Sequence, residues 1–289
     1  MNSDAWFLYS VAAMLAGAGY IVLGRKLTKL EVPIFAVLTW AMLATAIGAA
    51  FMANSWNVPL ILPNNGKTTT VLILAALCCF AGNAGELAAI VRAPNAAYVS
   101  AINKSYAAVT IFAAWWLFGS EVTWLKVAGS MVVVASMILV RAPWEQKKSD
   151  IADSGWIAYS LISFAGLAGL SLCSKYLMQG GMDRLIFLML LAFPVSAMFA
   201  AGWAVSGKKG KWDFQKIALM AGIGVVAVSL NYFLYSAILM APNLGYVNAI
   251  NSAQVIVIAG ASALLGDKLT FWRTLGIGGA SFGLLLIAI

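Results

Sequence analysis

Ten apolar runs, each long enough to cross a membrane, follow one another along the chain. They lie near 5–24, 33–53, 69–92, 96–118, 123–141, 155–178, 185–206, 216–240, 243–265 and 271–289. A membrane-spanning helix needs about 20 predominantly apolar residues, and lipid tolerates only segments that satisfy their own backbone hydrogen bonds. The pattern therefore predicts an all-α integral membrane protein with ten transmembrane helices.

The composition agrees with a chain whose solvent is mostly lipid. Hydrophobic residues make up 63% of the 289 positions and charged residues 10%, whereas a soluble domain carries about 25% charged residues. The three cysteines, Cys78, Cys79 and Cys173, all fall inside apolar runs. An odd number of thiols in such positions indicates neither a disulfide framework nor a zinc site, so we expect small core residues.

Several function classes are disfavoured by what the sequence lacks. The chain has no histidine, and nearly every carboxylate lies in a loop or at a helix end, so we expect no enzyme, no metal and no cofactor. The G-x-x-x-x-G-K-[ST] phosphate-binding pattern is also absent, which argues against ATP hydrolysis. The net charge of +8 comes from residues in short loops, which favours membrane topology over a nucleic-acid partner.

A duplication divides the chain into two halves. The polar stretch 142–154 lies near the middle, between a first five-helix repeat at 1–141 and a second at 155–289. The segment 93–103, Ala-Pro-Asn-Ala-Ala-Tyr-Val-Ser-Ala-Ile-Asn, aligns on 241–251, Ala-Pro-Asn-Leu-Gly-Tyr-Val-Asn-Ala-Ile-Asn, with eight of eleven residues identical. An odd number of spans per half forces the second half to insert upside down, which predicts two inverted five-helix repeats.

Further matches extend the repeat in both directions. With small changes of offset, Ala16, Gly17, Lys26, Asn83, Gly119, Thr123 and Gly129 fall on Ala165, Gly166, Lys175, Asn231, Gly266, Thr270 and Gly276.

Charge placement predicts the orientation in the membrane. Thirteen positive residues fall on one face of the expected bundle, and four, Lys67, Lys126, Lys175 and Arg184, fall on the other. Positive residues collect on the cytoplasmic side, so both termini are expected outside the cytoplasm, with the cell (inner) membrane as the location.

The turn that ends each half carries a family resemblance. Gly119-Ser120-Glu121-Val122-Thr123, followed by Gly129, resembles the glycine–glutamate turn of the drug/metabolite transporter superfamily, in particular its EamA-like branch. The second copy reads Gly266-Asp267-Lys268-Leu269-Thr270 with Gly276. The resemblance implies a ten-helix permease that exports or exchanges small metabolites. The proline that this family often has inside the fourth and ninth spans is absent from 106–108 and 253–255, so a kink there needs another cause.

Two ionisable residues lie deep within the apolar runs. Glu86 precedes the turn at Pro94 by eight residues and Lys104 follows it by ten, which puts both about 12–15 Å from the turn, near the bilayer midplane. Charges at that depth are costly and tend to be functional. We predict that the two side chains face a central substrate site. The alternative is an ion pair that only holds two helices together.

Other polar or aromatic side chains within the spans complete the candidate substrate site. They are Asn83, Asn103, Asn231, Asn251, Gln254 and Trp40. For the asparagines, hydrogen bonding between helices is an open alternative, because an amide in lipid needs an internal partner. The GxxxG spacing of Gly279 and Gly283 predicts a close helix contact, either within the chain or with a second copy in a homodimer.

These observations favour a secondary transporter of a small polar metabolite, such as an amino acid, that works by alternating access around a midplane site. A proton-coupled exporter of cations or multiple drugs that uses Glu86 is one alternative. A passive pore is another, although a pore is normally lined by polar residues along several helices.

The orientation can be tested with a reporter. A reporter fused after Ile289 is expected to be active only when it is one that works outside the cytoplasm, since the positive charges favour the opposite face. Activity of a cytoplasm-dependent reporter at this position would contradict the orientation but not the repeat.

Overall fold

In a computed structural model, the described residues are 5–60, 62–63, 65–92, 99, 102–141, 155–207, 212–254, 256–258 and 271–289. Within these ranges the chain forms helices and no strands, which confirms the all-α prediction. Ten helices have defined bounds: α1 (Ala5–Lys29), α2 (Ile34–Ser55), α3 (Gly66–Arg92), α5 (Tyr106–Phe118), α6 (Trp124–Arg141), α7 (Gly155–Gln179), α8 (Arg184–Ser206), α9 (Phe214–Met240), α10 (Leu244–Ser252) and α12 (Phe271–Ala288). The expected linker 142–154 and the turn 266–270 lie outside the described residues, as does most of the 93–103 repeat segment.

Length and composition make these helices suited to a membrane. Among the described residues, α1, α2, α7, α8 and α9, together with Gly66–Ile90 of α3, are long and apolar enough to cross a bilayer, and α6, α10 and α12 contain shorter apolar stretches. Large apolar side chains such as Phe51, Trp116 and Phe214 are 72%, 80% and 87% exposed. Such exposure suits a lipid-facing surface, and the chain is a multi-pass membrane protein.

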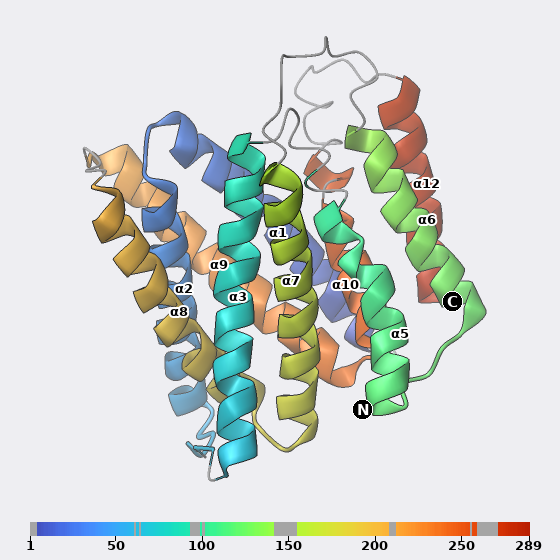
Figure 1. Cartoon of the computed structure of the whole chain (residues 1–289), viewed down its shortest axis with the longest axis horizontal. Helices are drawn as coiled ribbons and strands as arrows, with labels where there is room; N and C mark the ends of the chain where they lie inside the picture. Colours follow the sequence, from blue (N-terminus) through green and yellow to red (C-terminus); the bar gives the residue numbers. More distant parts are fainter. Residues whose placement is uncertain are drawn as a thin grey trace.

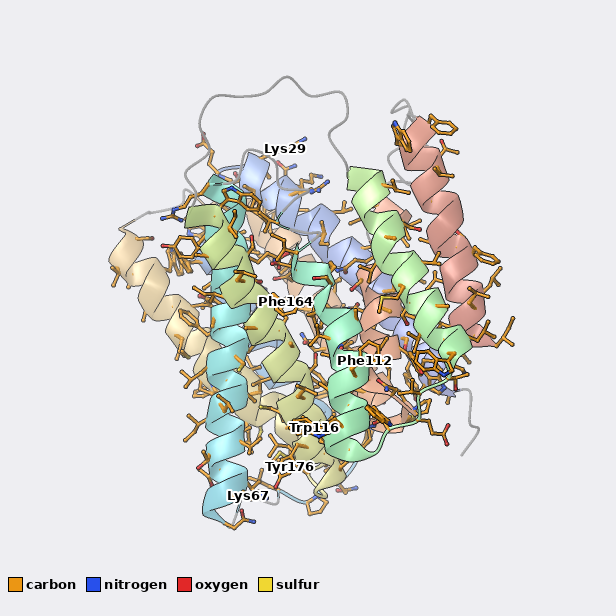
Figure 2. The ribbon with its side chains drawn as sticks, turned by 45° about the vertical axis from the view of Figure 1, so that its right-hand side comes forward. Lys29, Lys67, Phe112, Trp116, Phe164 and Tyr176 are labelled. Atoms are coloured by element: carbon orange, nitrogen blue, oxygen red, sulfur yellow. The ribbon has the colours of Figure 1, made fainter. Side chains whose placement is uncertain are left out.

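The bundle has two ends. We call the end where α1 begins and α12 ends the termini face, and the end of Lys29, Arg92 and Arg141 the basic face (Figure 1). Lys67, at the start of α3, and Tyr176, near the end of α7, lie at the termini face, opposite Lys29 (Figure 2).

Each helix packs mainly against a helix from the other half of the chain. The most extensive neighbours are α3 with α7, α6 with α12, α1 with α9, and α2 with α8, and α5 lies against α10. Figure 1 shows α3 and α7 side by side, with α1 and α9 running obliquely behind them.

Glycines allow the closest of these contacts. A methyl group on Gly166 of α7 would lie 2.6 Å from the Gly82 nitrogen and 2.8 Å from the Cys78 carbonyl oxygen of α3, so only glycine fits there. Between α6 and α12, methyl groups on Gly129 and Gly283 would each lie 2.7 Å from the other residue's carbonyl oxygen. The close contact predicted from the GxxxG spacing is therefore made with α6 of the same chain.

Two helix breaks occur at matching places without a proline. The helical residues Ile102–Lys104 are separated from α5 by a turn at Ser105, and α10 ends in a turn at Ala253. The amide of Ser105 donates to Ile102 O at 3.3 Å, and that of Ala253 donates to Ile250 O at 3.0 Å. These three-residue bonds interrupt the α-helical ladder, so the kink expected from the resemblance has a local backbone cause instead of a proline.

The α3–α7 contact predicts a strict glycine requirement. Gly166→Ala is expected to lower the melting temperature in detergent, with a cost of about 1–3 kcal/mol, because its methyl group would meet the α3 backbone. Gly278→Ala is the matched control, since nothing lies within 4 Å of a methyl group there, and alanine favours a helix by up to about 1 kcal/mol. Equal melting temperatures for the two variants would contradict the close contact.

Candidate functional site

A polar stripe runs along one face of α3. Cys79, Asn83 and Glu86 are spaced four and three residues apart, so they share a face of the helix. The Asn83 Nδ2 donates to the carbonyl oxygen of Cys79 at 2.8 Å, one turn earlier in the same helix. Glu86 is half-buried on this stripe.

Tyrosines from three other helices gather around this stripe. The Glu86 carboxylate lies within electrostatic interaction range of the hydroxyls of Tyr20 on α1 and Tyr106 on α5. Tyr235 on α9 lies within the same kind of range of Tyr106 and of Cys79. The α1, α3, α5 and α9 helices therefore meet around Glu86.

These tyrosines were not among the candidate residues expected from the sequence. Tyr106 and Tyr235 are 6% and 3% exposed, and Phe187 packs edge-on against Tyr235 with ring centroids 5.0 Å apart. In the sequence, a tyrosine at a functional site inside an apolar run looks the same as a tyrosine that only packs in the core. The available signal was that Tyr20 lies well inside its span, away from the bilayer interface where tyrosine is common.

Glu86 forms no ion pair among the described residues. Lys104 is half-buried, lies directly before the turn at Ser105, and interacts with neighbouring groups. The described contacts of the Glu86 carboxylate are its electrostatic interactions with Tyr20 and Tyr106.

On α10 and just beyond it, two predicted residues are buried. Asn251 is 8% exposed, and its Oδ1 is a buried acceptor without a hydrogen-bond partner among the described residues. Gln254, 6% exposed, lies against Gly17 of α1, one turn away from Tyr20. Since buried acceptors are normally paired, the Asn251 oxygen is suited to receive a donor from a ligand.

Three other predicted residues connect helices. Asn231 of α9 donates to Thr45 Oγ1 of α2 at 3.3 Å. The Trp40 indole of α2, 37% exposed, donates to the Met220 carbonyl oxygen of α9 at 2.6 Å.

Asn103 is a third connecting residue and is fully buried against α7. With its amide oriented to suit its neighbours, Nδ2 donates to Ser160 O and Oδ1 accepts from Ser163 Oγ, both at 3.1 Å. The bonds of Asn103, Asn231 and Trp40 favour a helix-joining role for these three side chains.

Asn103 and Asn251 are equivalent in the repeat, but replacing each by alanine should have different effects on the stability of the protein. Asn103→Ala is expected to lower the melting temperature, by about 0.6–2 kcal/mol of stability, because it breaks bonds to α7. Asn251→Ala removes an unpaired acceptor, so stability should stay equal or rise while ligand affinity falls. A loss of stability in Asn251→Ala as large as in Asn103→Ala would count against a ligand role for Asn251.

Comparison with known proteins agrees with this architecture. A solved crystal structure superposes with a TM-score of 0.80 at 14% sequence identity, covering 100% of this chain and 99% of that one. At this identity the similarity shows the fold alone. No curated protein sequence matches the chain.

The sequence itself carries the family signature in its first half. Residues 4–142 match the EamA-like transporter family. These residues include α1 to α6, with Glu86, Tyr20, Tyr106 and Lys104 among them. The family consists of membrane transporters, in agreement with the apolar helices and with the resemblance noted at the Gly119–Thr123 turn. The first half of this multi-pass membrane protein is therefore similar to the EamA-like transporter family.

Proposed function

We propose that this protein is a secondary transporter, an exporter or exchanger, that moves a small polar metabolite such as an amino acid by alternating access. The observation that carries the proposal is Glu86. It is a half-buried carboxylate within the membrane helix α3, has no ion pair among the described residues, and interacts electrostatically with Tyr20 and Tyr106. A carboxylate in such a place needs a cationic or proton partner, and a substrate ammonium can supply it.

The helix contacts support an inverted repeat, with 1–141 and 155–289 as its halves. If α1, α2, α3 and α6 are exchanged with α7, α8, α9 and α12, the α1–α9 contact becomes the α7–α3 contact, and the α2–α8 and α6–α12 contacts map onto themselves.

Individual residues support the same exchange. Gly17 of α1 lies near Leu230 of α9, and their equivalents, Gly166 of α7 and Gly82 of α3, also lie in contact. A contact pattern of this kind is typical of transporters whose two halves rock around a central site.

The polar groups suit a substrate that carries both charges. Glu86 would bind an ammonium group, Lys104 a carboxylate, and Asn251 Oδ1 a hydrogen-bond donor. Only the first half carries the two charged residues, because the repeat places Leu234 and Ser252 at the positions equivalent to Glu86 and Lys104. Such asymmetry favours a site shaped for one asymmetric ligand.

An organic cation is the second candidate. Tyr20, Tyr106 and Tyr235 offer ring faces and hydroxyls near Glu86, and aromatic faces attract cations. In this alternative Glu86 alone binds the substrate or a coupling proton, and Lys104 contributes nothing to affinity.

A ligand screen on charge variants distinguishes these functions. Thermal shift of the purified protein with amino acids, organic acids and amines should reveal a ligand, since a concentration of about 100 times Kd adds about 2.7 kcal/mol of stability. Glu86→Gln should abolish the shift from amino acids and amines and leave the unliganded melting temperature nearly unchanged. Lys104→Met should abolish only the shift from amino acids.

Two outcomes contradict the amino-acid proposal. If Lys104→Met leaves every shift unchanged, the cation alternative holds. If both single variants unfold and the double variant recovers stability and transport, Glu86 and Lys104 only hold helices together. A single-channel current through the purified protein would instead indicate a pore.

A further inference from the structure

A buried lysine joins α7 to the end of α9. Lys175 is 3% exposed, and its Nζ donates to the carbonyl oxygens of Ile238, Ala241 and Leu239 at 2.7, 3.1 and 3.3 Å. From the sequence, Lys175 was expected among the positive charges of loops and helix ends. It lies inside the bundle, near the termini face.

The sequence explains why carbonyl oxygens are available there. The Ile238 carbonyl would normally accept from the amide four residues later, but residue 242 is a proline, which has no N–H. The backbone is already extended at Ala241, where α9 ends, so the last carbonyl groups need donors from outside the helix. The negative end of the helix dipole also favours a cation. The Lys175 ammonium thus satisfies α9 while α9 satisfies the buried charge.

This contact connects two helix pairs, α3 with α7 and α1 with α9. In one pair, α3 and α7 are joined by close glycine contacts in the middle and by cation–π contacts at both ends. Lys67 lies 5.3 Å from the Tyr176 ring centroid at the termini face (Figure 2), and Arg92 lies 4.6 Å from that of Tyr159 at the basic face. In the other pair, α9 packs along α1. Lys175 therefore attaches the α3–α7 pair to the α1–α9 pair at the termini face.

The first half contains the same elements on the opposite face. Lys26 of α1 is the repeat equivalent of Lys175, and Ile90 and Pro94 are the equivalents of Ile238 and Pro242. Pro94 likewise cannot donate to the Ile90 carbonyl. Yet Lys26 is exposed at the basic face and makes no hydrogen bond or ion pair within the described part of the chain. Lys175 thus donates hydrogen bonds to a helix end at the termini face, whereas Lys26 donates none to the described residues at the basic face.

We infer that Lys175 and Lys26 are reciprocal gate residues of the transport cycle. In the arrangement described, Lys175 holds the two helix pairs together at the termini face. In the opposite state Lys175 releases the end of α9, and Lys26 takes the carbonyl oxygens at the end of α3, beginning with Ile90. This inference rests on the alternating access proposed above, and it gives both states a similar set of bonds, as a transporter that populates both states requires.

Distances between spin labels report the opening of each face. Exposed positions suit the labels: Leu8 on α1 and Gln179 on α7 for the termini face, and Lys29 on α1 and Ile157 on α7 for the basic face. Each position is replaced by cysteine in the full chain. The native thiols are buried or half-buried, and labelling of the parent chain measures their background.

Lys175→Met should shift the population toward a longer distance between positions 8 and 179 and a shorter one between positions 29 and 157. The rise in the open population is expected to be about tenfold, since bonds to a charged group are lost. Lys175→Arg, which keeps several donors, should restore part of the parent distribution. A lowered melting temperature with both distance distributions unchanged would make Lys175 only a helix cap and overturn the inference.

Lys26→Met is the matched variant, and it decides the matter if Lys175→Met does not fold. It should leave the melting temperature unchanged, because Lys26 is exposed, but reduce the population with the shorter distance between positions 29 and 157 about tenfold, because the opposite state is no longer stabilised. An unchanged distance distribution between positions 29 and 157 in Lys26→Met would overturn the reciprocal gate. The distance measurements need no ligand, so failure of the ligand screen would count against the proposed substrate and not against the gate.

Discussion

Lipid offers no hydrogen bonds, and this constraint decides the role of each polar group in the bundle. Most hydroxyl side chains satisfy it within their own helix, as Ser10 does with Trp6 O and Thr45 does with Ala41 O, both at 2.8 Å. Asn103 and Asn231 satisfy it by joining neighbouring helices. Against that background, Asn251 Oδ1 and the Glu86 carboxylate stand out, because neither is paired among the described residues. Polar groups without a partner inside the bundle are the ones that a substrate can bind.

The same constraint explains the contrast between glycine-lined and bulky contacts. Between membrane helices, association depends on close packing and on a few polar bonds, since lipid tails compete with apolar side chains. Gly82 and Gly166 let α3 and α7 approach until their backbones touch, whereas Gly17 of α1 faces the larger Leu230 of α9 and Gln254, which lies just beyond α10. The α3–α7 pair is therefore suited to move as one body. The α1–α9 contact is filled by side chains, and these side chains can repack when the angle between the two helices changes.

Much of the architecture could be predicted from the sequence, because hydropathy and length determine what can cross a bilayer. Eight of the expected spans coincide with observed helices, whereas 96–118 and 243–265 are matched only by α5 and α10 among the described residues. Glu86 lies within α3, as expected, six residues before Arg92. Repeat equivalence did not predict that Asn103 and Asn251 have different surroundings, since an alignment assigns the same role to both. The tyrosines around Glu86 were missed because three separate spans have to meet before they become neighbours. The breaks at Ser105 and Ala253 depend on local backbone bonds for which the sequence has no proline signal.

Lys175 illustrates how the proposed repeat can combine a symmetric scaffold with an asymmetric site. Its position, its partner carbonyl groups and the proline that frees one of them all have counterparts in the other half, so the capacity to form the bond is symmetric. Whether the bond forms depends on conformation, and in this arrangement it forms at the termini face. Glu86 and Lys104, by contrast, have no chemical counterpart in Leu234 and Ser252. A chain that keeps its helix-joining groups in both copies and its charged groups in one can expose the same site alternately to both sides of the membrane.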